Sequence, residues 1–177
     1  MKNVVLVAFD DLINVVRYRD AFGAAFETPN LDRLMAMGTF FDNAHAVVPA
    51  CNPSRAAVLT GQSPFHNGIE ENGTDFFRAL DPTTTLPYLL HEAGYRTGGV
   101  GKMFHLMPLQ ERERPPLDAF LDTMYDRYRP TDGDRIEGHG KSILGALTPG
   151  TTPERDLADA RAVHWASEFV ERQEGGK

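Results

Sequence analysis

The feature that most constrains the fold is a short apolar run near the start of the chain. Val4–Phe9 reads VVLVAF without interruption. A continuous apolar run of this length is typical of a strand buried on both faces of a parallel sheet, because helices cover both faces of such a sheet. The run ends at Asp10 and Asp11, so two carboxylates are expected at the carboxyl end of the strand. Open α/β sheets bind ligands at that edge, so the sequence predicts an α/β fold with an acidic site there.

Capping and turn signals predict the next elements. Thr28 is a suitable helix N-cap, Pro29 suits the first helical position, and Gly38 suits a helix end. The same signals predict a helix from about Pro53 to Thr60 closed by Gly61, a helix from Leu86 to Ala93 closed by Gly94, and a strand over Tyr95–Val100.

The second half of the sequence is less regular. Residues 110–150 are rich in Pro, Asp, Arg and Gly, and we expect an irregular surface excursion there. Beyond it, Thr152–Glu154 has the composition of a helix start. The apolar face of this predicted helix comprises Leu157, Ala160, Val163, Ala166 and Val170, and its solvated face comprises Arg161, Glu168 and Glu171.

The most specific motif surrounds Cys51, the only cysteine in the chain. Cys51–Gly61 reads CNPSRAAVLTG, which has the form C-x-P-S-R followed by L-T-G. A lone cysteine is often only a small buried thiol, but so many specified positions at fixed offsets favour a functional motif. The stretch resembles the signature of the type I, formylglycine-dependent sulfatases of the alkaline phosphatase superfamily.

The resemblance implies a modified nucleophile at Cys51. In that family a separate maturation enzyme oxidises the cysteine to formylglycine, whose hydrated aldehyde attacks the sulfur of a sulfate ester. The second hydroxyl later expels sulfate, an exit that an unmodified thiol lacks. The resemblance also implies that Arg55 holds the formylglycine and the metal ligands in place. A helix N-terminus at this point favours the negative charge that gathers there.

Asp10 and Asp11 match the aspartate pair that follows the first strand of the family. Alone, an Asp-Asp pair is more often a helix cap or a solvated turn. Its place about forty residues before the cysteine motif favours metal binding instead. Carboxylates are hard oxygen ligands that suit Ca²⁺ or Mg²⁺, and we expect Asp10, Asp11 and modified Cys51 to bind the metal.

A second motif follows the predicted strand near residue 100. Gly94–His105 reads GYRTGGVGKMFH and resembles the second sulfatase signature. The resemblance implies that Lys102 neutralises sulfate oxygens and that His105 assists proton transfer or binds sulfate. Two residues separate Lys102 from His105, as in the iduronate-sulfatase-like branch, which acts on sulfated sugars.

Together these motifs imply a metal-dependent sulfuric ester hydrolase acting on sulfated carbohydrates. The implied fold is a three-layer α/β/α sandwich with a mostly parallel sheet, of which residues 1–177 form the N-terminal part. Later family segments add further metal and sulfate ligands that have no counterpart after His105, so the chain alone is expected to be inactive. The implied partners are a sulfated small molecule or saccharide and the maturation enzyme.

Two alternatives stay open. A phosphonate or phosphate ester hydrolase of the same superfamily shares the metal site and the formylglycine. A catalytically incomplete fragment that only binds metal keeps the motifs without turnover. Comparing the turnover of sulfate esters with that of phosphonate esters distinguishes the first alternative from a sulfatase. Metal binding without turnover identifies the second alternative.

The charge and hydropathy of the sequence limit the classes of partner that we expect. The formal net charge is −7 and the sequence pI is near 5.3, which argues against a broad nucleic-acid-binding surface. The run Val4–Phe9 is too short to span a bilayer, so no membrane partner is expected. The first residues also lack a signal peptide, which predicts a cytoplasmic protein as written, or a periplasmic or secreted one if a leader is omitted.

Several motif-like stretches carry no functional prediction. Asn72–Thr74 is a formal glycosylation sequon, but Asn-Gly is first of all a turn signal. Gly138–Ser142 ends like a phosphate-binding loop and lacks its first glycine. The remaining ionisable candidates are expected to be ordinary surface or loop residues: His66, His91, His139, Asp156, Asp159 and His164.

Overall fold

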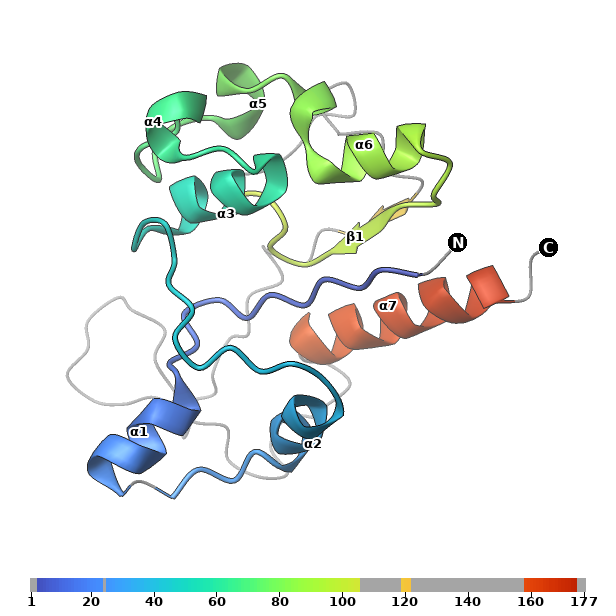
Figure 1. The fold of residues 1–177 in the computed structure, drawn as a ribbon. Coiled ribbons are helices and arrows are strands. Elements are labelled where there is room, and N and C mark those ends of the chain that lie inside the picture. Colours follow the sequence, from blue (N-terminus) through green and yellow to red (C-terminus); the bar gives the residue numbers. More distant parts are fainter. Residues whose placement is uncertain (1–2, 24, 106–118, 122–157, 175–177) are drawn as a thin grey trace, which may run out of the picture.

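The structure, a computed structural model, describes residues 3–23, 25–105, 119–121 and 158–174. Helices dominate these residues (Figure 1). In chain order the elements are α1 (Val15–Phe22), α2 (Pro29–Met37), α3 (Cys51–Thr60), α4 (Pro64–Asn67), α5 (Phe76–Ala79), the 3₁₀ helix η1 (Pro82–Thr84), α6 (Leu86–Glu92), β1 (Gly98–Val100), β2 (Ala119–Leu121) and α7 (Ala158–Glu174). None of the described helices is long and apolar enough to cross a membrane.

The predicted helices of the first hundred residues are confirmed. α2 begins at Pro29 and ends before Gly38. α3 begins two residues before the predicted start, because Pro53 is tolerated in a first turn, where a backbone N–H is not needed. Gly61 closes α3 at φ 68°, and its N–H donates to the carbonyl of Ala57 at 2.8 Å. Glycine adopts this left-handed conformation without the steric cost of a Cβ, which explains the sharp helix end.

The described strands form one parallel pair. β1 aligns with β2 so that Gly98 pairs with Ala119 and Val100 with Leu121. The strand predicted over 95–100 is thus confirmed at its carboxyl end. β2 lies inside 110–150, where little regular structure is predicted, and the rest of that stretch lies outside the described residues. Helices with a parallel strand pair give the described residues α/β character, but no larger sheet is present among them.

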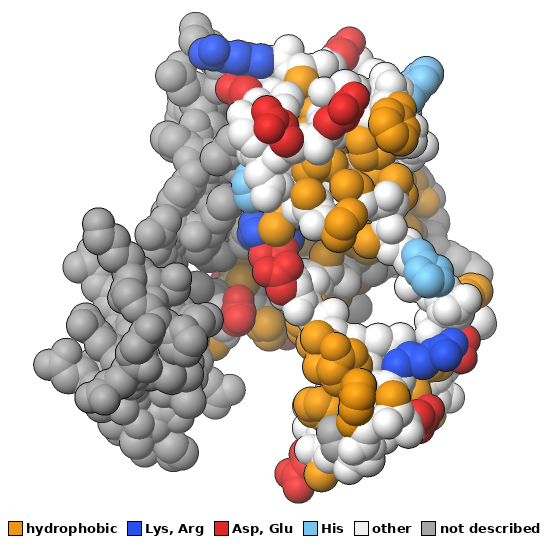
Figure 2. All heavy atoms as spheres, turned by 90° about the vertical axis from the view of Figure 1, so that its left-hand side faces the viewer, with side chains coloured by type: hydrophobic (Ala, Val, Ile, Leu, Met, Phe, Trp, Pro, Cys, Tyr) orange, Lys and Arg blue, Asp and Glu red, His pale blue; other side chains and the backbone are white. Residues whose placement is uncertain are grey.

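The prediction of a buried strand at Val4–Phe9 is wrong for the described residues. The segment has no strand pairing, and its large side chains are 61–69% exposed. An apolar run becomes an internal strand only where neighbouring strands and covering helices enclose it, and β1 and β2 are the only strands described. Figure 2 shows patches of hydrophobic side chains open to solvent among the described residues of the face that it draws.

The core joins α3 to the segment that follows β1. Its buried members are Ala56, Leu59, Ile69, Phe76 and Phe104. We call Phe76, Phe77 and Phe104 the aromatic cluster: the ring of Phe104 lies 5.2 Å from that of Phe76 and 4.9 Å from that of Phe77, edge to face. Such pairs contribute beyond the apolar area that they bury. The cluster therefore fixes α5 against the chain that carries the second motif.

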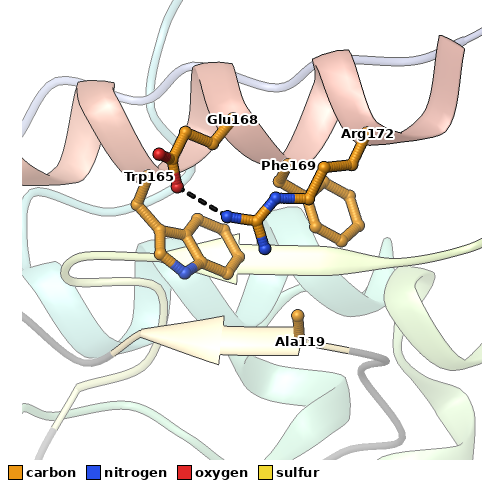
Figure 3. A pocket seen from close by; sticks show the side chains of 5 residues that line it. All are labelled: Ala119, Trp165, Glu168, Phe169 and Arg172. Carbon is orange, nitrogen blue, oxygen red and sulfur yellow. Dashed lines mark hydrogen bonds and ion pairs between the residues drawn. The ribbon is translucent and has the colours of Figure 1, made fainter. Parts of the chain in front are cut away.

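α7 packs on β1 through aromatic side chains. The rings of Trp165 and Phe169 are stacked with centroids 5.4 Å apart, and both line a small pocket together with Ala119 (Figure 3). The predicted apolar face is partly wrong, because Val163 is 66% exposed. The ring of Phe169, one turn after Trp165, lies against Gly98 of β1, so the aromatic side of the helix faces the strand. The predicted helix start at Thr152–Glu154 lies outside the described residues.

Candidate active site

Cys51 is the first residue of α3. Ala50 precedes it in extended conformation, and the N–H of Ser54 donates to the carbonyl of Ala50 at 3.1 Å to close the first turn. Cys51 is partly buried and its thiol is free. The helix macrodipole places partial positive charge at this end, so a developing anion on residue 51 is stabilised there.

Asp10, Asp11 and Cys51 converge on one point. One ligand atom from each lies within 4.8 Å of the other two. Asp11 has φ 54°, in the left-handed region that aspartate adopts more readily than most residues. The predicted metal-binding residues are therefore together in space, although they come from two segments about forty residues apart.

The donor set fits a hard divalent cation. Two carboxylates supply oxygen ligands, and the Sγ atom of Cys51 occupies the place of the oxygen that a formylglycine hydrate would offer. Ca²⁺ takes about six to eight oxygens and Mg²⁺ about six, so three residues leave positions for water, substrate or other ligands. The exposed Asp11 leaves room for them on the solvent side.

Arg55 connects the cysteine helix to the aspartate pair. Its Nη2 donates to Oδ1 of Asp10 at 2.7 Å, and its Nη1 donates to the backbone carbonyl of Lys102. Arg55 lies four residues after Cys51, which places both on the same face of α3. Its side chain is only 15% exposed. A rigid guanidinium in this position holds Asp10 and the second motif at a fixed distance from α3.

Lys102 contacts the other oxygen of the same carboxylate. Its Nζ donates to Oδ2 of Asp10 at 2.5 Å, so Asp10 is bound by two cations. Partial burial raises the pKa of Asp10, but the hydrogen bonds and charges of Lys102 and Arg55 outweigh it and hold the pKa below its usual value. Asp10 is therefore ionised at neutral pH, as a metal ligand must be.

His105 lies beside these charges. Burial lowers its pKa first, the positive charges of Lys102 and Arg55 lower it further, and Asp10 opposes them. Among the described residues its buried Nδ1 has no hydrogen-bond partner. A neutral imidazole at neutral pH can accept a proton or donate its own.

All six predicted site residues thus come together. Asp10 contacts both Arg55 and Lys102, and one ligand atom of each aspartate lies near Cys51. The charges of Lys102, Arg55 and Asp10 shift the pKa of His105. Sequence reasoning missed a second, uncharged set, in which Asn52 contacts the turn around Asn72. The available signal was an asparagine next to the cysteine and an Asn-Gly turn twenty residues later.

Comparison with known proteins identifies the family of the chain. The sulfatase family model matches residues 2–143. A protein named sulfatase from Formosa agariphila is 38% identical over 94% of this chain and 35% of its own length. The N-acetylglucosamine-6-O-sulfatase of Bacteroides thetaiotaomicron is 36% identical over 59% of this chain and 18% of its own. The human N-acetylgalactosamine-6-sulfatase is 42% identical over 45% of this chain and 17% of its own.

No solved structure matches the chain. The chain spans about a third or less of the length of these curated relatives. The family match nevertheless covers most of the sequence and includes every residue of the site described above. The chain therefore belongs to the sulfatase family.

Proposed function

We propose that this chain carries the nucleophile side of the active site of a metal-dependent sulfuric ester hydrolase, with formylglycine made from Cys51. One observation carries the proposal: a carboxylate pair, a cysteine at a helix start and two cations meet around Asp10. Such a cluster can bind a metal, present a nucleophile and neutralise an anionic ester in the same place.

Each residue has a distinct part in this proposal. Asp10, Asp11 and residue 51 would hold Ca²⁺ or Mg²⁺, and the bound cation would lower the pKa of an attacking oxygen. Lys102 neutralises sulfate oxygens as negative charge develops on them. Arg55 keeps Asp10 in place through its 2.7 Å contact. His105 moves a proton or binds a sulfate oxygen.

Sulfated carbohydrates are the proposed substrate class. Two of the relatives are named for the 6-sulfates of N-acetylglucosamine and N-acetylgalactosamine, and a human relative, 42% identical over 45% of this chain, is named N-sulphoglucosamine sulphohydrolase. The proposed partners are therefore a sulfated saccharide and a maturation enzyme that oxidises Cys51.

The proposed fold of the complete family domain is a three-layer α/β/α sandwich with a mostly parallel sheet. Two features support it: the parallel pair of β1 and β2, and the match of the sulfatase family model to residues 2–143. In such a sandwich the exposed side chains of Val4–Phe9 would be covered by neighbouring strands and helices.

Mass spectrometry of the peptide that contains Cys51 tests the nucleophile. Conversion of the thiol to the aldehyde in a host with the maturation enzyme removes about 18 Da from the peptide. Turnover of glucosamine 6-sulfate or an aryl sulfate by the converted chain would then support the sulfatase. Faster turnover of the matched phosphonate ester would support the phosphonate hydrolase instead.

A metal-binding chain without turnover is the second candidate. The three ligand residues favour it, because Ca²⁺ takes about six to eight oxygens and Mg²⁺ about six. Equilibrium dialysis with Ca²⁺ and Mg²⁺, run beside the ester assays on the same converted chain, distinguishes the two. Metal binding without hydrolysis supports this candidate, and hydrolysis of either ester class eliminates it.

A further inference from the structure

We propose that Asn72 is a positioning residue for Cys51, acting through the first turn of α3. The inference rests on the proposed function of Cys51 as the precursor of the nucleophile. Neither asparagine involved belongs to the charged site. Asn52 occupies the variable position of the C-x-P-S-R pattern, and Asn72 opens the Asn-Gly turn twenty residues later.

The first turn of α3 has no cap from its own flank. Ala50 occupies the N-cap position, and its methyl group cannot accept a hydrogen bond. Pro53 has no N–H, and the N–H of Ser54 is already bonded to Ala50. The Oδ1 atom of Asn72 supplies the missing acceptor, because it accepts the backbone N–H of Asn52 at 2.9 Å. The capping group thus comes from a turn twenty residues later in the chain.

The side chain of Asn52 also binds the turn around Asn72. It is completely buried, and its Nδ2 donates to the carbonyl oxygens of Glu71 at 3.2 Å and Thr74 at 2.7 Å. Two carbonyl acceptors fix the orientation of the carboxamide, because a flipped amide would place its oxygen against both. Three hydrogen bonds therefore join the turn to the residue directly after Cys51.

The same turn is anchored to the other side of the site. Asp75 follows the turn and caps α5 with its side chain. Phe76, the first residue of α5, is buried against Phe104 in the aromatic cluster. Phe104 lies between Lys102 and His105 in the second motif. One short turn thus links the helix that carries the nucleophile to the segment that carries the sulfate-binding residues.

This linkage matters for catalysis more than for the core. Asn72 is exposed and buries little surface, so its loss should loosen the start of α3 without unfolding the chain. A nucleophile displaced by about 1 Å can lose about 100-fold in rate, because reacting atoms must be held in near-attack geometry. The Asn72 cap therefore keeps residue 51 aimed at the metal and the ester.

The rate of alkylation of Cys51 by iodoacetamide tests the proposal in the unmodified full chain, where this thiol is the only one. Asn72→Ala removes the acceptor and should raise the rate about fivefold, the factor that corresponds to a capping hydrogen bond of ~1 kcal/mol. Asn72→Asp keeps an acceptor oxygen whose charge suits a helix N-terminus, so its rate should stay within about twofold of the wild-type rate. Asn30→Ala, at an exposed position of α2, is the matched control and should leave the rate unchanged.

Alkylation in low urea separates local opening from unfolding of the whole chain. Local opening exposes little surface, so the Asn72→Ala rate should be nearly independent of urea well below the unfolding transition. A wild-type rate in Asn72→Ala, an equally raised rate in Asn72→Asp, or a steep urea dependence would overturn the proposal. Because the thiol readout needs neither conversion nor turnover, absence of sulfatase activity beside the expected rates would remove only the proposed function.

Discussion

Arg55 and Asp10 form an ion pair of 2.7 Å between residues forty-five positions apart, and the Arg55 side chain is only 15% exposed. The carboxylate belongs to the proposed metal site, and the guanidinium belongs to the helix that begins at Cys51, the precursor of the proposed nucleophile. The pair therefore joins two functions that the sequence holds in separate motifs, and it makes the stability of the chain and the geometry of the site depend on the same contact.

Arg55→Ala should destabilise the chain by about 1–2 kcal/mol. Breaking a fully buried ion pair costs about 3–5 kcal/mol, and we expect less here because Asp10 is 38% exposed and screened by solvent. Urea unfolding of wild type and variant measures the difference. Arg17→Ala is the control, because its pair with Asp42 spans 3.4 Å with side chains 54% and 66% exposed, and its loss should cost less than about 0.5 kcal/mol. Equal effects of the two variants would contradict the role of Arg55.

Asp10→Asn should weaken binding of Ca²⁺ or Mg²⁺ at least about tenfold, because it removes one of two carboxylate ligands. Titration calorimetry with each ion on the unmodified chain measures the affinity. The matched control is Asp20→Asn, at an exposed position of α1. It removes the same charge away from the cluster and should leave the affinity within about twofold of wild type. An equal loss in both variants would indicate a net-charge effect instead of a ligand.

The stability of the chain should depend on pH through His105. Burial, followed by the charges of Lys102 and Arg55, lowers the folded pKa of His105 below its ordinary value of 6.5. The unfolded chain therefore binds more protons as the pH falls through 6.5, and the folded state loses stability from there down to the folded pKa. His105→Asn should flatten the plot of unfolding free energy against pH between about 7.5 and 5.5.

The control for this experiment is His66→Asn, at an exposed position of α4. It should keep the wild-type slope over the same pH range, measured by urea unfolding at each pH. A wild-type slope in His105→Asn would show that the imidazole is not destabilised in its charged form.

Gly98→Ala should destabilise the chain by about 1–3 kcal/mol through overpacking. A Cβ at residue 98 would lie 2.8 Å from the ring of Phe169, so α7 or the ring must move. Thermal unfolding of Gly98→Ala, Phe169→Leu and the double variant forms a cycle. The two substitutions should be strongly non-additive, because the smaller leucine relieves the contact. Simple additivity would mean that α7 does not pack on β1 through this pair.

The sequence predicted those parts of the structure that depend on neighbouring residues. Pro29 and Gly61 act on their own turns of helix, so the bounds of α2 and the end of α3 were predictable. The burial of Val4–Phe9 depends on covering strands and helices, which no local pattern reports. The predicted burial of Val163 was wrong for a similar reason. Periodicity places Val163 on the apolar face, but α7 packs through the side that carries the rings of Trp165 and Phe169.

The candidate site also has a part that could be predicted from the sequence and a part that could not. The charged residues were predictable because their motifs fix residue types at set spacings, and the structure adds that Arg55 and Lys102 share one carboxylate. The contacts of Asn52 with the turn around Asn72 could not be predicted. Asn52 and Asn72 are both uncharged side chains. The hydrogen bonds that join Asn52 to the turn depend on how two distant segments fold together.

The left-handed backbone of Asp11 has a consequence for how the acidic pair can act. In an extended strand, consecutive side chains point to opposite faces, so adjacent aspartates could not share one ligand. With φ at 54°, Asp11 departs from extended backbone in the turn that it forms with Asp10, and both carboxylates reach the same point beside Cys51. The conformation of a single residue thus brings two neighbouring carboxylates to one point, as the proposed metal site requires.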